Sequence, residues 1–247
     1  MHFLHLYKKS VVLIYIVFSL FLDNVYADDQ INRNEIEKII HEYIMNNPEV
    51  LIKSVEKLRL TVEQEEKEKE DYLTQNFNTF ANKTNIPWQG KENANVVLVE
   101  FFDYNCGYCK KSLDAITEIL NYDYDIKISF RDYPILAPTS RVAARAALAS
   151  HKQKKYFLFH SNLMNFKENL SEKTIFDIAK NSNLDVKRLK KDMNDPEIIA
   201  IIENNENLAK KLGIRGTPTF LINGKLYAGA LDLNRLKFLI EEALSKI

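Results

Sequence analysis

The sequence is poor in cysteine, glycine, proline and tryptophan. Two cysteines in 247 residues are too few for a scaffold held by several disulfides or for a four-cysteine zinc module. With six glycines, six prolines and 46% hydrophobic residues, the chain is neither collagen-like nor low in complexity, and it can form an apolar core. Net charge is also absent, because 34 basic residues balance 34 acidic ones. Nothing in this balance favours a nucleic-acid partner.

The first 27 residues have the parts of an export signal. Lys8 and Lys9 form a positive start, residues 10–22 (SVVLIYIVFSLFL) form an apolar run, and residues 25–27 (VYA) fit a cleavage site. The run is shorter than the ~20 apolar residues of a spanning helix, although an uncleaved membrane anchor is the alternative. We predict cleavage near Ala27 and export to the periplasm or cell surface, where disulfides persist.

A highly charged region without glycine follows, over residues 28–84. Asn47 and Pro48 fit an N-cap and a first helical position, which predicts a short helix before them and a long one after them. The long helix begins with an apolar seam spaced at four, three and four residues, and its residues 63–71 (EQEEKEKED) are almost wholly charged. The seam consists of Leu51, Val55, Leu58 and Val62. We interpret the region as a helical arm whose seam either joins several chains or packs back on its own domain.

From residue 85 the pattern changes to alternating strands and helices. A β-rich apolar run comes directly before the two cysteines, and an amphipathic helix comes directly after them. Helical sequence then fills about residues 138–212, and Asn223-Gly224 predicts a tight turn between two late strands. The predicted elements are strands at 96–102, 126–130, 217–222 and 225–228, and helices at 110–120, within 139–211 and at 233–244. Ser171 and Asp195-Pro196 fit helix starts within the long helical block, and Gly213 fits a helix stop.

The cysteines stand together as Cys106-Gly107-Tyr108-Cys109, where the strand passes into the helix. A helix N-terminus presents unpaired N–H groups and a positive dipole end, and both stabilise a thiolate. We therefore predict a lowered pKa and a nucleophilic role for Cys106, with Cys109 as the resolving thiol one turn further on. The alternatives are an inert structural disulfide and half of a metal site. Because no histidines are paired at ligand spacing, we predict no metal.

Two motifs carry a resemblance to a known family. Residues 99–110 (VEFFDYNCGYCK) and 216–220 (GTPTF), with a helical block between them, resemble the DsbA-like branch of the thioredoxin superfamily. The resemblance covers about residues 85–247 and implies an α/β thioredoxin fold with an inserted helical subdomain. It also implies a cis peptide bond between Thr217 and Pro218 that faces the cysteines. An ordinary trans proline at the start of a strand is the alternative.

The same resemblance assigns roles to further residues. Glu100 stands six residues before Cys106, where the family carries a buried carboxylate beneath the active site. Burial raises the pKa of a carboxyl group, so Glu100 would exchange protons with Cys109, unless it is an edge or partly exposed glutamate. We assign Thr217, Pro218 and Tyr108 to client binding, the first through its backbone. Asp103 and Tyr104 are expected to be turn and packing residues.

Weaker resemblances predict whether the protein isomerises, reduces or forms disulfides. The Gly-Tyr dipeptide between the cysteines and the threonine before the proline are similar to those of DsbC-type isomerases. The arm resembles the oligomerising helices of suppressor-of-copper-sensitivity C and Com1-like proteins. These likenesses imply an exported thiol–disulfide isomerase or reductase, with a redox-active Cys106–Cys109 disulfide and no other cofactor. The implied partners are cysteine-containing client proteins, a membrane redox partner and further copies of the chain in a dimer or trimer. A monomeric dithiol oxidase and a binding module with a structural disulfide are the alternatives.

Overall fold

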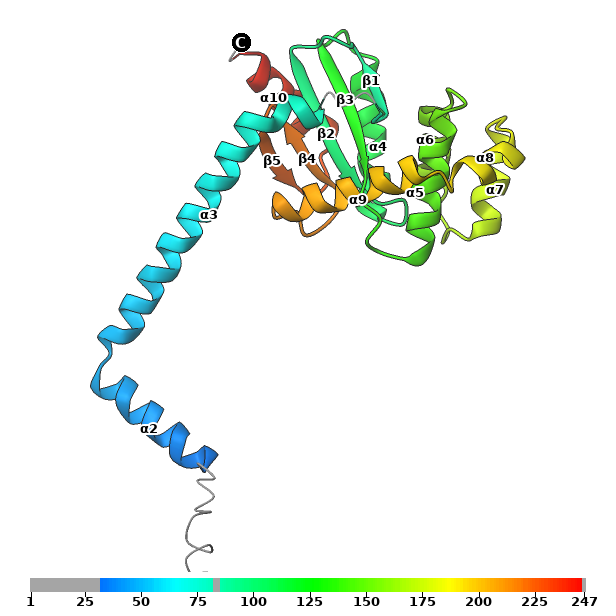
Figure 1. Ribbon diagram of the computed structural model, residues 1–247. Helices are drawn as coiled ribbons and strands as arrows, with labels where there is room; N and C mark the ends of the chain where they lie inside the picture. Colours follow the sequence, from blue (N-terminus) through cyan, green and yellow to red (C-terminus); the bar gives the residue numbers. More distant parts are fainter. Residues whose placement is uncertain (1–31, 82–84, 246–247) are drawn as a thin grey trace, which may run out of the picture. The chain divides into compact units, whose positions relative to one another are not determined.

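The computed structural model describes residues 32–81 and 85–245, so the predicted export signal lies outside the described residues (Figure 1). The chain divides into two compact units, Met1–Val62 and Glu63–Ile247. This division falls within a helix, earlier in the chain than the change of composition at residues 84 and 85. No helix among the described residues is long and apolar enough to cross a bilayer.

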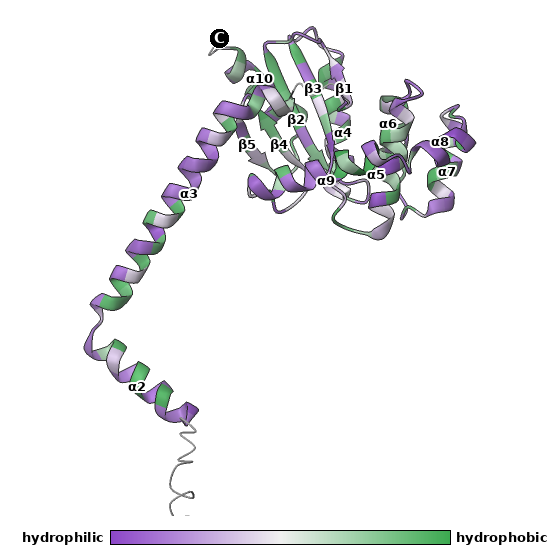
Figure 2. Ribbon diagram, viewed as in Figure 1, coloured by the Kyte–Doolittle hydropathy of each residue, from purple (hydrophilic) through white to green (hydrophobic). Residues whose placement is uncertain are grey.

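The first unit contains helix α2 (Arg33–Asn46) and the beginning of helix α3 (Glu49–Ala81). The two helices meet at Asn47 and Pro48 as predicted, since proline lacks the N–H that a continuous helix would use. Many apolar side chains of this unit are exposed. Figure 2 shows that hydrophobic residues recur along α2 and the first turns of α3. They are Ile36, Ile39, Ile40, Tyr43, Met45, Leu51, Ile52, Val55, Leu58, Leu60 and Val62. The seam is therefore not covered by other described residues of the first unit.

The second unit is built on a sheet which, within the described residues, has five strands in the order β1-β3-β2-β4-β5. Helix α4 (Gly107–Leu120) connects β2 to its parallel neighbour β3, and the other neighbouring strands pair antiparallel. The strands are β1 (Trp88–Gly90), β2 (Val96–Phe102), β3 (Ile126–Asp132), β4 (Thr219–Ile222) and β5 (Lys225–Ala228). The short strand β1 was not predicted, because three residues carry too little periodicity.

Helices cover both faces of this sheet, and every residue of β2 and β3 is buried. Alternate side chains of β2 enter two different cores. Leu98 and Phe102 pack in the core that contains α4 and α10 (Leu233–Leu244). Val99 lies in the other core, with Leu73 from the later part of α3 and with residues of α9 (Pro196–Lys211).

A helical insertion separates β3 from β4, as predicted. The described helices of this insertion are α5 (Pro138–His151), α6 (Tyr156–Asn165), α7 (Glu172–Asn181), α8 (Val186–Asp192) and α9. Ser171 and Asp195 cap α7 and α9 at the predicted starts, and each side chain accepts a backbone N–H of its own helix. Asp185 caps α8 in the same way, a start that the sequence analysis missed.

The chain returns to the sheet through three special backbone positions. Gly213 ends α9 with φ +67°, as predicted for a left-handed helix stop. The Thr217-Pro218 peptide bond is cis, so the trans alternative is wrong. Asn223 and Gly224 both have positive φ, as the predicted hairpin turn requires.

Candidate active site

Both cysteines lie at the carboxyl end of β2, where α4 begins. Cys106 is the N-cap residue of α4 with an extended backbone, and Cys109 lies in the first turn. Both are free thiols in this structure. Cys106 is 6% exposed and Cys109 is 1% exposed, so Cys106 carries the sulfur nearer to solvent.

The cis-proline loop lies directly beside Cys106. The Cys106 thiol donates a hydrogen bond to the backbone carbonyl of Thr217, with 3.1 Å between sulfur and oxygen. The Thr217 hydroxyl is buried and has no hydrogen-bond partner among the described residues. Tyr108, by contrast, is 64% exposed and lies between the two cysteines in sequence. The structure thus brings Thr217 to the sulfur and leaves Tyr108 open to solvent, while their roles in binding a client stay predictions.

The two thiols have opposite acidities. The pKa of Cys106 is lowered to about 5, chiefly because the Cys109 thiol donates a hydrogen bond to its sulfur. The backbone N–H groups of Tyr108 and Cys109 lower it further, while burial opposes them. Burial raises the pKa of Cys109 far above its usual range, and Cys106 and Glu100 raise it further. At pH 7 the lowered pKa of Cys106 therefore favours its thiolate form, whereas Cys109 keeps its proton.

Glu100 is a buried carboxyl on the face of β2 that carries Leu98 and Phe102. It is 1% exposed, so the alternative of an edge or partly exposed glutamate is wrong. Burial raises its pKa to about 8, and the charges of Cys106 and Asp132 add to the increase. Its Oε1 atom has no hydrogen-bond partner among the described residues. A carboxyl group with a pKa so close to neutral is suited to both accepting and returning a proton.

Replacing Glu100 with glutamine is expected to change how stability depends on pH. The pKa of Glu100 is about 8 in the folded chain and about 4.3 in an unfolded one. The folded state therefore holds a proton that the unfolded state releases between these values, and stability falls as pH rises. Relative to Glu100→Gln, the wild-type free energy of unfolding should fall by about 3 kcal/mol between pH 4.5 and pH 7.

Urea unfolding at several pH values measures this difference. The amide of the variant lowers stability by a constant amount at every pH, so the slope is the quantity to compare. Glu92→Gln is the matched control, because Glu92 is exposed and its replacement should leave the slope unaltered. Parallel pH profiles for wild type and Glu100→Gln would contradict the raised pKa.

Asp103 holds the loop that presents Cys106. Its carboxyl group accepts backbone N–H groups from Asn105 (2.7 Å), Ile135 (2.8 Å) and Leu136 (2.9 Å), and the hydroxyl of Ser140 (2.7 Å). These contacts connect the residues before α4 to the segment after β3 and to α5. Asp103 is thus a turn residue, as predicted, and it also fixes the position of the loop.

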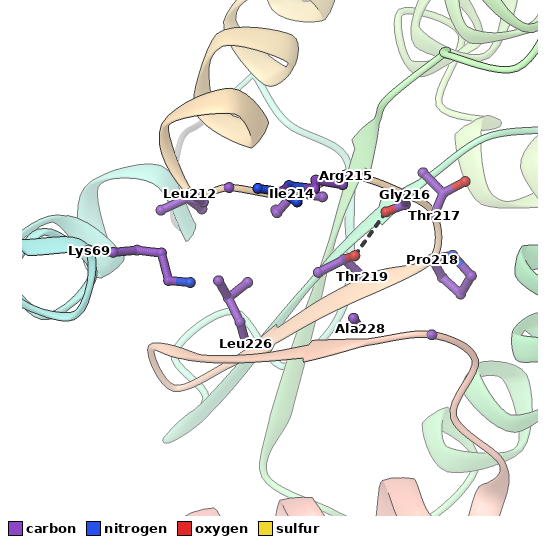
Figure 3. A pocket seen from close by; sticks show the side chains of 12 residues that line it. Lys69, Leu212, Ile214, Arg215, Gly216, Thr217, Pro218, Thr219, Leu226 and Ala228 are labelled. Carbon is purple, nitrogen blue, oxygen red and sulfur yellow. Dashed lines mark hydrogen bonds between the residues drawn. The ribbon is translucent and has the colours of Figure 1, made fainter. Parts of the chain in front are cut away.

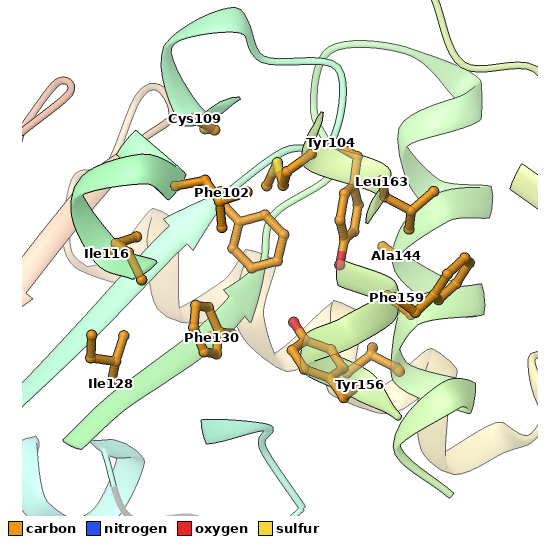
Figure 4. Close-up of a cluster of buried hydrophobic side chains, with 14 of the residues drawn as sticks. Phe102, Tyr104, Cys109, Ile116, Ile128, Phe130, Ala144, Tyr156, Phe159 and Leu163 are labelled. Atoms are coloured by element: carbon orange, nitrogen blue, oxygen red, sulfur yellow. The ribbon is translucent and has the colours of Figure 1, made fainter. Parts of the chain in front are cut away.

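Tyr104 begins a buried aromatic cluster beside the site. Its hydroxyl lies 3.1 Å from Nδ1 of His160, and Phe102 meets both rings edge to face. Figure 4 shows Tyr104 and Tyr156 with their hydroxyl groups turned toward one another, near Phe102. Burial lowers the pKa of His160 to about 3, so this imidazole is neutral at pH 7. The described residues contain no group of three or more histidine, cysteine or acidic side chains placed to hold a metal.

Two further residues near the site were missed or left undecided by the sequence analysis. Asp132 is 1% exposed, and burial raises its pKa well above the usual range. Asp132 is the last residue of β3 and pairs with Phe102 of β2. An acidic residue at the end of a strand is the sequence feature that could have revealed it. The Lys110 ammonium group donates a hydrogen bond to the carbonyl of Phe166. This hydrogen bond connects the first turn of α4 to the end of α6.

A dithiol between a central strand and a helix, with a cis-proline loop against the first sulfur, defines the thioredoxin class of proteins. The chain belongs to the thioredoxin family whose model, described as "Thioredoxin", matches residues 81–242. A second model, described as "Copper resistance protein ScsC N-terminal domain", matches residues 33–65. The predicted resemblance is confirmed in both parts of the chain.

Solved structures agree with this assignment. A thioredoxin-like oxidoreductase from Silicibacter pomeroyi is 36% identical, covers 68% of this chain and 97% of its own, and has a TM-score of 0.66. The thiol-disulfide exchange protein alpha-DsbA2 from Wolbachia pipientis is 35% identical over 70% of this chain and 95% of its own, with a TM-score of 0.66. A linker-deletion mutant of ScsC from Proteus mirabilis is 27% identical, covers 89% of this chain and 98% of its own, and has a TM-score of 0.67.

Curated relatives fall into two groups. The probable disulfide bond formation protein D of Bacillus anthracis is 27% identical over 64% of this chain and 77% of its own length. Na(+)/H(+) antiporter NhaA 1 of Salinispora arenicola is also 27% identical over 64% of this chain. This chain, however, spans only 24% of the antiporter.

Proposed function

We propose that the protein is an exported thiol–disulfide oxidoreductase that isomerises or reduces disulfides of client proteins as a homo-oligomer. The observation that carries the proposal is the placement of the two thiols: Cys106 caps α4 beside the carbonyl of Thr217 in the cis-proline loop, and Cys109 is buried in the first turn of the same helix. A nucleophile for disulfides must be a thiolate, and Cys106 has a pKa of about 5. A resolving thiol must wait in its protonated form, and the raised pKa of Cys109 supplies that.

The reaction follows from these two states. The Cys106 thiolate attacks one sulfur of a client disulfide, a Cys106–client bond forms, and the other client sulfur leaves as a thiolate. In isomerisation, a second client thiolate displaces Cys106, and no electrons are gained or lost overall. In reduction, Cys109 gives up its proton and attacks the Cys106 sulfur. The Cys106–Cys109 disulfide forms, the Cys106–client bond breaks and the client sulfur leaves as a thiolate, so that two electrons have passed to the client.

Glu100 takes the proton from Cys109 in that last step. The charge of Glu100 adds to the raised pKa of Cys109, which supports an exchange of a proton between the two groups. The Thr217 backbone, Pro218 and the exposed Tyr108 seat the client segment beside Cys106. A membrane redox partner would then reduce the disulfide and renew the thiols.

The oligomer is supported by the uncovered seam of the first unit. The side chains of Leu51, Val55 and Leu58 are each more than half exposed, although their spacing is that of a coiled-coil seam. Exposed apolar surface of this extent marks an interaction site. The match of residues 33–65 to the ScsC N-terminal domain covers this surface. We infer that two or three chains pair through it, so that several dithiols act on one client.

Refolding of scrambled ribonuclease tests the proposal. Wild-type protein should restore ribonuclease activity, and Cys106→Ala should not. The variant Leu51→Asp/Leu58→Asp should become monomeric in light scattering and lose most isomerase activity, yet still reduce insulin. Lys53→Asp, an exposed change on the same helix but off the seam, is the matched control and should stay oligomeric.

Two results would overturn parts of this proposal. Recovery no greater than with Cys106→Ala would exclude isomerase activity. A monomeric wild type that oxidises reduced ribonuclease would establish the oxidase alternative, which the lowered pKa of Cys106 also fits.

A further inference from the structure

A groove opens beside the cis-proline loop, on the face of the sheet that α3 and α9 cover. Its volume is about 430 Å³, and Figure 3 shows it between the loop that follows α9, strand β5 and Lys69 of α3. The walls all belong to the second unit. The lining residues that make the groove apolar are Leu212, Ile214, Pro218, Leu226 and Ala228.

The groove and the candidate active site share Thr217. Thr217 lines the groove, and its carbonyl oxygen is also the atom that lies 3.1 Å from the Cys106 sulfur. The turn at this point is held by the Thr219 hydroxyl, which donates to the carbonyl of Gly216 at 2.9 Å. A chain that brings a sulfur to Cys106 therefore meets the groove with its neighbouring residues.

The charged groups of the groove have one sign. Among the described residues that line it, the charged ones are Lys69 and Arg215, and no carboxylate is present. Neither cation forms an ion pair with another described residue. Glu66 and Glu70 flank Lys69 on α3, but they line the adjoining pocket. The groove thus offers two unpaired cations above an apolar floor.

The backbone around the groove leaves space for an extended chain. An added Cβ atom at Gly213, Gly216 or Gly229 would meet no other atom within 4 Å. Strand β5 is the outermost strand of the described sheet, so its free edge runs along one wall. An extended peptide has the shape to lie there.

We propose that this groove binds the client segment beside the attacked cysteine and selects segments that combine apolar side chains with aspartate or glutamate. The proposal rests on the proposed function and adds its substrate class. The apolar side chains cover the floor, and the carboxylates pair with Lys69 and Arg215. Because the net charge of the whole chain is zero, this preference has to come from the local pair of cations.

Three model peptides test the proposal on the full-length protein. Each carries one cysteine as a mixed disulfide with the same chromophoric thiol, flanked by Asp-Leu, Lys-Leu or Ser-Leu residues. The rate of chromophore release measures attack by Cys106. We expect wild-type protein to favour the acidic over the basic peptide by about tenfold, and added salt to reduce the ratio.

The double variant Lys69→Glu/Arg215→Glu should invert that ratio. The double variant Lys187→Glu/Lys191→Glu is the control, because it makes the same change of charge at exposed positions of α8, and it should keep the wild-type ratio. The single variants Lys69→Ala and Arg215→Ala, each expected to give an intermediate ratio, replace the double variant if it does not fold.

The outcomes separate this proposal from the function on which it rests. An equal ratio in wild type and double variant would overturn the groove as a selective site, while exchange itself continues. An equal loss with all three peptides would also overturn it, since it would indicate a structural role for the cations. No release from any peptide by wild type would instead contradict the proposed function.

Discussion

Cys106→Ser is expected to reduce disulfide exchange at least a thousandfold, to the level of the uncatalysed reaction. The variant retains only Cys109, which is 1% exposed and has a strongly raised pKa. A buried thiol that keeps its proton is not a nucleophile. Cys109→Ser should behave in the opposite way, because Cys106 would still attack but nothing would resolve the adduct.

Glutathione disulfide and mass spectrometry measure both variants. Cys109→Ser should accumulate one stable glutathione adduct at Cys106, and Cys106→Ser should remain unmodified over the same time. The two variants are matched controls, since each removes one sulfur from the same turn. A glutathione adduct on Cys109 in the Cys106→Ser variant, formed at the wild-type rate, would contradict the assignment of roles.

Asp103→Ala should cause the largest loss of stability among single substitutions near the site. The change removes the acceptor of three backbone N–H groups and of the Ser140 hydroxyl. Buried donors left without a partner are costly, so we expect a loss of about 4 kcal/mol in the free energy of unfolding. Asp103→Asn keeps one acceptor oxygen and should lose about half as much.

Chemical unfolding of the reduced proteins checks this expectation. Asp114→Ala is the matched control, because Asp114 is exposed on α4 and its loss should alter stability by less than about 0.5 kcal/mol. A loss below about 1 kcal/mol for Asp103→Ala would show that the four hydrogen bonds are not what holds the loop. We also expect slower exchange in this variant, since the loop presents Cys106.

Features that depend on local pattern could be predicted from the sequence. The apolar run of β2, the turn at Asn223 and Gly224, and the caps at Ser171 and Asp195 are each fixed by a few neighbouring residues, and all are present. The pair of cysteines at a helix start likewise predicted the acidity of Cys106, because a helix N-terminus stabilises a thiolate wherever it occurs. The cis bond before Pro218 came from the family resemblance, since a proline alone does not indicate its isomer.

Features that depend on distant segments could not be predicted. Nothing in the sequence around Asp103 indicates its contacts with residues 135–140, which follow β3 in the chain. The burial of Asp132 and of the polar residues of β3 follows from helices on both faces of the sheet, a layering that one strand does not reveal. The groove beside Thr217 needs α3, the loop after α9 and β5 together, and no short motif marks it.

The dependence of the Cys106 loop on the helical insertion limits how far this fold can be simplified. Ser140, at the start of α5, donates to Asp103, and His160 of α6 meets Tyr104. A shortened chain that joined β3 directly to β4 would keep the sheet and both sulfurs. It would nevertheless remove two partners of the segment that immediately precedes the nucleophile. The insertion therefore helps to position Cys106, and a minimal thioredoxin cut from this protein should carry a misplaced thiol.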